Sequence, residues 1–209
     1  MFVHSGYIHI SSNIIVQLLL GLPLEIVHGP WRIGLVYLAG VLTGALATTL
    51  TDPNEFLAGA SGGVYALMLA HLPTLIMNWQ EMKTFFEWLV SIVILSMGLV
   101  DFGVAIYHRY HEEPGHGSIG YAAHIGGGTA GLLVGMNVLR NFHHKVNLKK
   151  LFHLMFDHLY LQKWEGYLRL ICFLIWTIGI VISIVANSVA RQHFPKPNRN
   201  SIGDCSYYE

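Results

Sequence analysis

The sequence predicts an all-α membrane protein that crosses the bilayer six times. Charged residues make up 11% of the 209-residue chain and hydrophobic residues 53%, and the mean hydropathy is +0.48. Soluble domains usually carry about 25% charged residues, and such a deficit is expected where charges would have to enter hydrocarbon. The two cysteines are too few for a disulfide framework. The formal net charge of the chain is zero. Nothing therefore predicts a nucleic-acid partner.

Six stretches are long and apolar enough for membrane helices, since a span needs about 20 mostly apolar residues. They lie at about 7–28, 32–51, 59–78, 84–107, 118–139 and 167–190. The first and fifth stretches carry Gly, Ser, Asn and His. This composition indicates packing among other helices rather than against lipid.

Basic residues predict the orientation of these helices. Residues 140–169 hold six of the twelve Lys and Arg residues, and basic loops usually lie on the cytoplasmic side. A cytoplasmic loop is therefore expected at about 140–166, with an amphipathic surface helix at "LFHLMFDHLYL". The first, third and fifth helices then begin on the outer side. Residues 1–190 are expected to form the membrane domain, and 191–209 a disordered, non-cytoplasmic tail.

This orientation brings four polar side chains to a similar depth, just below the outer surface. Ser61 opens the third stretch, His124 lies near the start of the fifth, and His9 and Asn13 lie near the start of the first. His9 and Asn13 share one helix face because they are four residues apart. A serine and a histidine at one depth suggest acyl transfer.

The chemistry follows from these residue types. A serine hydroxyl is a weak nucleophile that needs a neighbouring base. His124 can accept its proton and later return it to the leaving amine. Asn13, His9 and the backbone N–H of Ser61 can donate to the developing oxyanion. No acidic residue is evident that would orient His124, so the prediction is a Ser–His dyad rather than a triad.

Glycines around both residues favour a close approach of the two helices. Gly59 and Gly62 flank the serine, and Gly127 begins a glycine-rich face below the histidine. Small residues allow two helix backbones to come near each other in a membrane. Tyr65, one turn after the serine, is expected either to pack against the imidazole or to be an ordinary core residue.

The motifs "GASG" at 59–62, "AHIGG" at 123–127 and "HSGYIHISSN" at 4–13 together resemble the rhomboid family of intramembrane serine proteases. The stretch "VQLLLGLPLEIVHGPWRIGLVYLAGVLTGALA" is similar to the animal rhomboid-related, secretase-type branch. The resemblance extends to about residue 190. It implies that His4, His9 and Asn13 match the family's His-X4-His-X3-Asn segment, with His4 in a supporting role.

The resemblance also implies a difference from the family. The branch has a six-helix core and a seventh C-terminal helix, so the six stretches correspond to the second to seventh helices. The first helix is expected to be missing. No cleavable signal peptide is expected at the start of this sequence either.

The resemblance implies a protease that cuts single-pass membrane proteins, for example growth-factor precursors, within or near their transmembrane segments. Its partners are these substrates and the lipid bilayer, and it needs no cofactor. The expected compartment is the secretory pathway (Golgi or endosome) or the plasma membrane. A non-catalytic, client-binding relative, inactive for want of the first helix, is the alternative.

Other interpretations stay open at this stage. Ser61 can be a small helix-packing residue, and His124 a buried histidine bonded to a backbone carbonyl. Asn13 and His9 can tie the first helix to a loop. A metal site at His108, His111 and His116 is not expected, because their spacing matches no standard zinc site. A transporter would require internal repeats, and none is evident.

Overall fold

The computed structural model describes residues 7–51, 60–78, 92–94, 96–100, 103–104, 107, 121–140 and 151–193. Side chains are described for all of these except residues 8, 9, 151–163 and 190–193. The described elements are helices, and this part of the chain contains no strand. The helices are α1 (Tyr7–His28), α2 (Pro30–Thr51), α3 (Ser61–Leu69), α4 (His71–Asn78), α6 (Tyr121–Val138) and α7 (Leu151–His193).

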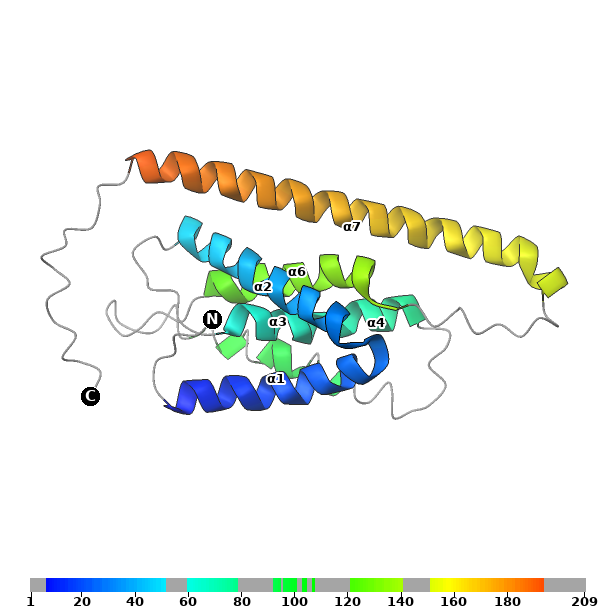
Figure 1. Cartoon of the computed structure of the whole chain (residues 1–209), viewed down its shortest axis with the longest axis horizontal. Coiled ribbons are helices and arrows are strands. Elements are labelled where there is room, and N and C mark those ends of the chain that lie inside the picture. The colour runs from blue at the N-terminus through cyan, green and yellow to red at the C-terminus, as the bar shows by residue number, and fades with distance from the viewer. Residues whose placement is uncertain are drawn as a thin grey trace, which may run out of the picture.

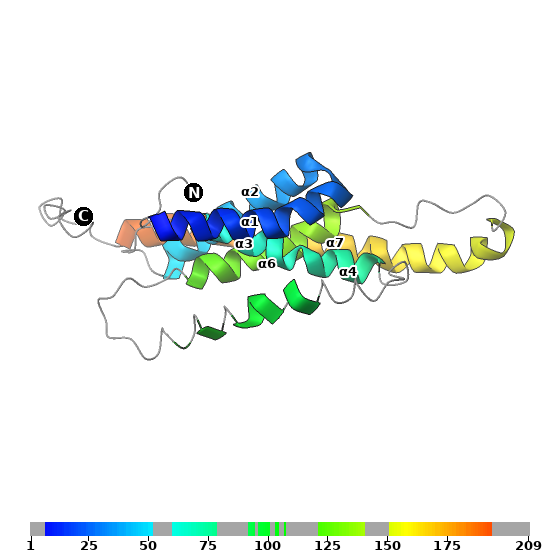
Figure 2. The ribbon, with the colours of Figure 1, turned by 90° about the horizontal axis from the view of Figure 1, so that it is seen from below.

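The helices lie side by side along the long axis of the molecule (Figure 1). Helices α1, α3 and α6 begin at one end of the bundle, and α2 and α7 run in the opposite direction (Figures 1 and 2). Helix α6 packs most extensively against α2 and α3. The first turns of α1, α3 and α6 therefore share one end of the molecule, as expected for spans that alternate in direction.

The first two expected helices are confirmed almost to the residue. Helix α1 covers the expected 7–28, and α2 begins two residues before the expected 32. Gly29 separates them with φ +91°, a left-handed conformation that favours glycine. Pro30 then opens α2, at the helix position where the missing N–H of proline costs nothing.

The third expected helix is divided into α3 and α4. Its predicted range was 59–78, but α3 ends at Leu69 and α4 starts at His71. Pro73 has no N–H to donate to the carbonyl of Leu69, so the regular hydrogen-bond ladder is interrupted there. Ala70 keeps a right-handed conformation at φ −66°, ψ −16°, and the chain continues in the same direction.

The C-terminal helix is longer than expected. The expected span was 167–190, preceded by a cytoplasmic loop at about 140–166, but α7 is already helical from Leu151 and continues to His193. The segment expected as a separate surface helix is therefore the first part of α7, which extends beyond the other helices (Figure 1). Most of the expected helix at 84–107 and the tail after His193 lie outside the described residues.

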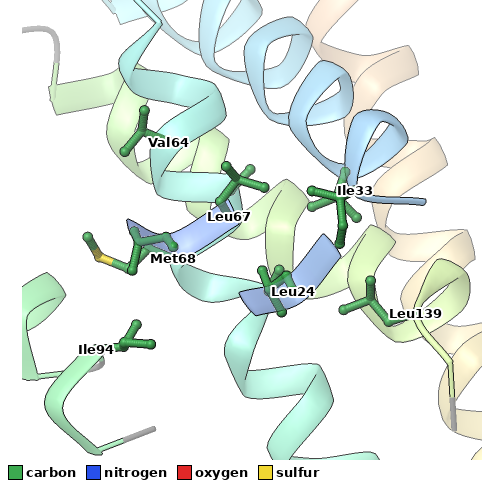
Figure 3. Close-up of a cluster of buried hydrophobic side chains, with 11 residues drawn as sticks. Leu24, Ile33, Val64, Leu67, Met68, Ile94 and Leu139 are labelled. Carbon is green, nitrogen blue, oxygen red and sulfur yellow. The ribbon is translucent and has the colours of Figure 1, made fainter. Parts of the chain in front are cut away.

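Helix α3 occupies the middle of the hydrophobic core. Val64, Leu67 and Met68 on α3 form one buried cluster with Leu24 of α1 and Ile33 of α2 (Figure 3). Burial of each such side chain contributes roughly 1.5–3 kcal/mol in water. In a bilayer this term applies less, because lipid is as apolar as the core, and close packing holds the helices together instead.

Three of the described helices are long and apolar enough to cross a membrane. These spans are Ile10–His28, Pro30–Thr51 and Trp164–Val189. Helix α6 and the α3–α4 pair do not reach the same length and hydropathy, although they lie inside the bundle. Their small and polar residues face neighbouring helices rather than lipid, so a high hydropathy is not required of them. The fold is that of a helical membrane protein.

Candidate active site

The proposed serine and histidine lie on helices whose backbones are in contact. A side chain at Gly127 of α6 would collide with the carbonyl oxygen of Gly62 in α3, and would lie 2.7 Å from the Cα of Gly62. One turn further, a side chain at Gly131 would collide with the carbonyl of Ala66. The two helices can approach this closely only because these positions of α6 carry no side chain.

Helix α2 also packs closely against both α3 and α6 through glycines. A Cβ at Gly44 would lie 2.8 Å from the carbonyl oxygen of Ala123, the residue before His124. A Cβ at Gly40 would collide with the side chain of Ala66. The small-residue stretch "AGVLTGALA" of α2 carries these glycines. It is a signal of close packing that was not used to predict the site.

Ser61 is the first residue of α3. It is partly exposed, whereas all seven residues that follow it are buried. Ala60 precedes the helix with φ −96°, ψ 8°, and its side chain makes no capping hydrogen bond. The first N–H groups of a helix have no partner within the helix, so the N–H of Ser61 is not used by α3 itself. The serine thus combines an accessible hydroxyl with the positive end of a helix dipole.

His124 lies in the first turn of α6 and is buried. Its ring stacks on the ring of Tyr65, with centroids 4.0 Å apart and an angle of 13° between the planes. Tyr65 follows Ser61 by four residues, so both lie on the same face of α3. Tyr65 holds the imidazole against the face of α3 that carries Ser61, and Gly62 contacts α6, so Ser61 and His124 both border the α3–α6 interface.

Asn13 lies at the same end of the bundle on α1 and is partly buried. Helix α1 meets α3 where a Cβ at Gly21 would lie 3.4 Å from Leu67 Cδ1. At 1.5 Å per residue, Asn13 lies about 12 Å before that contact and Ser61 about 9 Å before it. The two residues are therefore at a similar depth.

The other predicted site residues are described less fully. His9 belongs to α1, but its side chain is outside the description. His4, Gly59 and the loop histidines His111 and His116 lie outside the described residues altogether. Among the side chains that are described, no group of three His, Cys, Asp or Glu residues is arranged to hold a metal ion.

The arrangement has the parts that acyl transfer needs. A hydroxyl lies at a helix N-terminus, an imidazole stacks on the tyrosine one turn after it, and glycine contacts bring the backbones of the two helices together. Preorganised donors and dipoles in such a site stabilise a developing negative charge. A helical membrane protein with a serine and a histidine so placed belongs to the class of intramembrane serine hydrolases or their inactive relatives.

Comparison with known proteins places the chain within this class. The family model described as "Rhomboid domain" matches residues 1–141. The chain is 43% identical over 148 residues to "Rhomboid-related protein 3" of Homo sapiens, covering 70% of this chain and 37% of that protein. It is 45% identical over 142 residues to "Rhomboid-related protein 2" of Mus musculus, covering 68% of this chain and 47% of that protein. The chain belongs to the rhomboid family, in its animal rhomboid-related branch.

More distant relatives differ in activity according to their names. "Rhomboid-type serine protease 2" of Emericella nidulans is 32% identical over 142 residues, 68% of this chain and 26% of that protein. "Inactive rhomboid-related protein 2" of Caenorhabditis elegans is 34% identical over 131 residues, 63% of this chain and 36% of that protein. The chain spans less than half the length of each of these relatives. Family membership alone therefore does not decide whether it is a protease.

Proposed function

We propose that the chain is an intramembrane serine endopeptidase in which Ser61 is the nucleophile and His124 the general base. The observation that carries the proposal is the stacking of His124 on Tyr65, one turn after Ser61 on the same face of α3. A histidine that served only as a packing residue would not need a serine hydroxyl beside it at a helix N-terminus. The glycine contacts between α3 and α6 support the same assignment.

The reaction follows from the two side chains. His124 accepts the hydroxyl proton of Ser61 while Oγ attacks the carbonyl carbon of the substrate peptide bond. The tetrahedral intermediate places its negative oxygen near the N–H of Ser61, with Asn13 and His9 as further donors. His124 then gives the proton to the leaving amine, and a water molecule hydrolyses the acyl-enzyme with His124 again as base. Each oxyanion donor contributes about 3–4 kcal/mol in serine hydrolases.

The substrates we propose are single-pass membrane proteins, for example growth-factor precursors. A membrane helix hides its carbonyl groups in internal hydrogen bonds, so a substrate must unwind locally before Ser61 can attack it. Gly costs about 1 kcal/mol relative to Ala in a helix, and substrate helices with Gly near the outer surface should therefore be cut most readily. We place this activity in the secretory pathway or the plasma membrane.

The proposal is tested by co-expressing the 209-residue chain with a tagged single-pass growth-factor precursor. The wild-type chain should release the ectodomain, and Ser61→Ala should abolish release. Ser188→Ala is the matched control, because Ser188 is exposed and its hydroxyl donates to the carbonyl of Ile184 within its own helix α7. Release that persists in Ser61→Ala would overturn the assignment of the nucleophile.

A non-catalytic, client-binding function is the second candidate. It is favoured by the similarity to an inactive rhomboid-related protein. In the same experiment this function predicts that the precursor co-purifies with the chain and is never cut, in the wild type and in Ser61→Ala alike. Cleavage by the wild type excludes it.

A further inference from the structure

We propose that His28 is a positioning residue that sets the axial register of the two catalytic helices from the opposite end of the bundle. This inference rests on the proposed protease function. His28 is the last residue of α1 and has no exposed surface. A fully buried polar side chain costs free energy unless its hydrogen bonds are satisfied, so the question is what its two ring nitrogens bind.

The two nitrogens of His28 bind two different segments. The backbone N–H of Arg140, just after α6, donates to Nδ1 of His28 at 3.0 Å. Nε2 of His28 lies 3.1 Å from Oγ1 of Thr74 in α4. Since Nδ1 accepts a hydrogen bond, it carries no proton, and the neutral ring must carry its proton on Nε2. Nε2–H therefore donates to the Thr74 hydroxyl.

The hydrogen-bond chain continues into α3 and ends at a backbone carbonyl. The hydroxyl of Thr74 donates to the carbonyl oxygen of Ala70 at 3.1 Å, where α3 passes into α4. Arg140, His28 and Thr74 thus each donate to the next residue of the hydrogen-bond chain, and the carbonyl of Ala70 is the last acceptor. One neutral imidazole joins the inner end of the α3–α4 segment to the end of α6.

A second side chain from the same corner acts on the same helix end. Arg32, in the first turn of α2, donates from Nη1 to the carbonyl oxygen of Val138 at 2.6 Å. Its guanidinium also lies 4.7 Å from the ring centroid of Trp31. The left-handed turn at Gly29 brings the end of α1 and the start of α2 to this corner. The C-terminus of α6 is therefore held by both α1 and α2.

The clamp formed by the His28 hydrogen bonds to Thr74 and Arg140 is far from the reaction centre. It nevertheless joins the same two segments, α3–α4 and α6, that carry Ser61 and His124. Thr74 follows Ser61 by 13 residues and Arg140 follows His124 by 16, or about 20 and 24 Å at 1.5 Å per residue. Gly127 and Gly131 present no side chains that would interlock with α3 and oppose sliding along the helix axes. A link between the two inner ends fixes that sliding coordinate, and with it the alignment of Ser61 with His124.

The test compares His28→Leu and Thr74→Val with the wild-type chain in detergent micelles. Thr49→Val is the matched control, because the hydroxyl of Thr49 donates to the carbonyl of Leu46 within its own helix. The readout is covalent labelling of Ser61 by a fluorophosphonate probe, followed in time. The final labelled fraction reports how much protein is folded, and the rate constant reports how well His124 activates Ser61.

Loss of register should lower the labelling rate constant at least about tenfold in both variants, since a misplacement of about 1 Å can cost about 100-fold. The final labelled fraction should stay close to that of the wild type. The double variant should be no slower than the slower single variant, because both substitutions break one hydrogen-bond chain. A purely structural role would instead lower the labelled fraction and leave the rate constant unchanged, which would overturn the proposal.

The same experiment separates this inference from the proposed function. If the wild-type chain is not labelled at Ser61, the protease assignment fails. The register proposal is then tested by hydrogen exchange of the Arg140 amide, which His28→Leu should speed at least about tenfold by removing its acceptor. Unchanged exchange in His28→Leu would refute the clamp itself. Restoration of the labelling rate by His28→Gln, whose amide can both accept and donate, would support it.

Discussion

Replacement of Gly127 by alanine tests one of the two tightest glycine contacts between α3 and α6. The added Cβ would collide with the Gly62 carbonyl oxygen and lie 2.7 Å from the Gly62 Cα and carbonyl carbon. Carbon atoms pack at about 3.5–4.0 Å, so α3 and α6 must separate by roughly 1 Å. The atoms that collide are backbone atoms within a helix, so no side-chain rotation can relieve the strain.

Two effects follow from this separation. Overpacking of this kind costs about 1–3 kcal/mol of folded stability. In the molecules that still fold, a displacement of about 1 Å between nucleophile and base lowers the reaction rate by as much as about 100-fold. Gly127→Ala should therefore lower both the melting temperature in micelles and the rate of substrate cleavage.

The matched control is Gly179→Ala in α7, where an added Cβ meets no atom within 4 Å. Alanine is the better helix former by about 1 kcal/mol, so this variant should be as stable as the wild type or slightly more stable. The two variants make the same chemical change with opposite expected signs. A Gly127→Ala protein with wild-type melting temperature and cleavage rate would refute the packing argument.

Two further predictions concern side chains around the same helices. Tyr65→Leu should slow labelling of Ser61, because the stacked ring, worth about 0.5–1.5 kcal/mol as an aromatic pair, no longer orients His124. Tyr65→Phe should keep the labelling rate within about twofold. An unaffected Tyr65→Leu protein would show that the stacking is incidental. Arg32→Met should lower the stability by about 1.5–3 kcal/mol, the usual range for a hydrogen bond to a charged group. Thermal unfolding measures this loss, and the idea fails if the melting temperature is unchanged.

Helix α7 illustrates how hydropathy and burial diverge in this protein. The span Trp164–Val189 is the most apolar of the three membrane spans. Only 6% of its most apolar stretch is nevertheless buried in the structure. Its polar residues mark the side that meets the bundle: Trp176 Nε1 donates to Thr43 Oγ1 at 3.2 Å, and Asn187 Nδ2 to the carbonyl of Leu46 at 3.3 Å. In a membrane, apolar residues face outward and polar residues identify the protein interface.

Sequence patterns alone determined several features of the fold. The bounds of α1 and α2 followed from apolar stretches of bilayer length, because a membrane restricts helices to that length. The common end of α1, α3 and α6 followed from membrane spans that alternate in direction along the chain. The pairing of Ser61 with His124 was predicted from residue types at one depth and from flanking glycines.

Only the tertiary structure decided which faces of these helices meet. The collision of a side chain at Gly127 with Gly62, and the stacking of Tyr65 on His124, depend on how α3 and α6 are rotated about their axes. The role of His28 was not predicted at all, because its two partners, Thr74 and Arg140, are 46 and 112 residues away. Local patterns fix helix length and depth, whereas rotation and register are settled by packing between distant segments, and that packing is visible only in the folded chain.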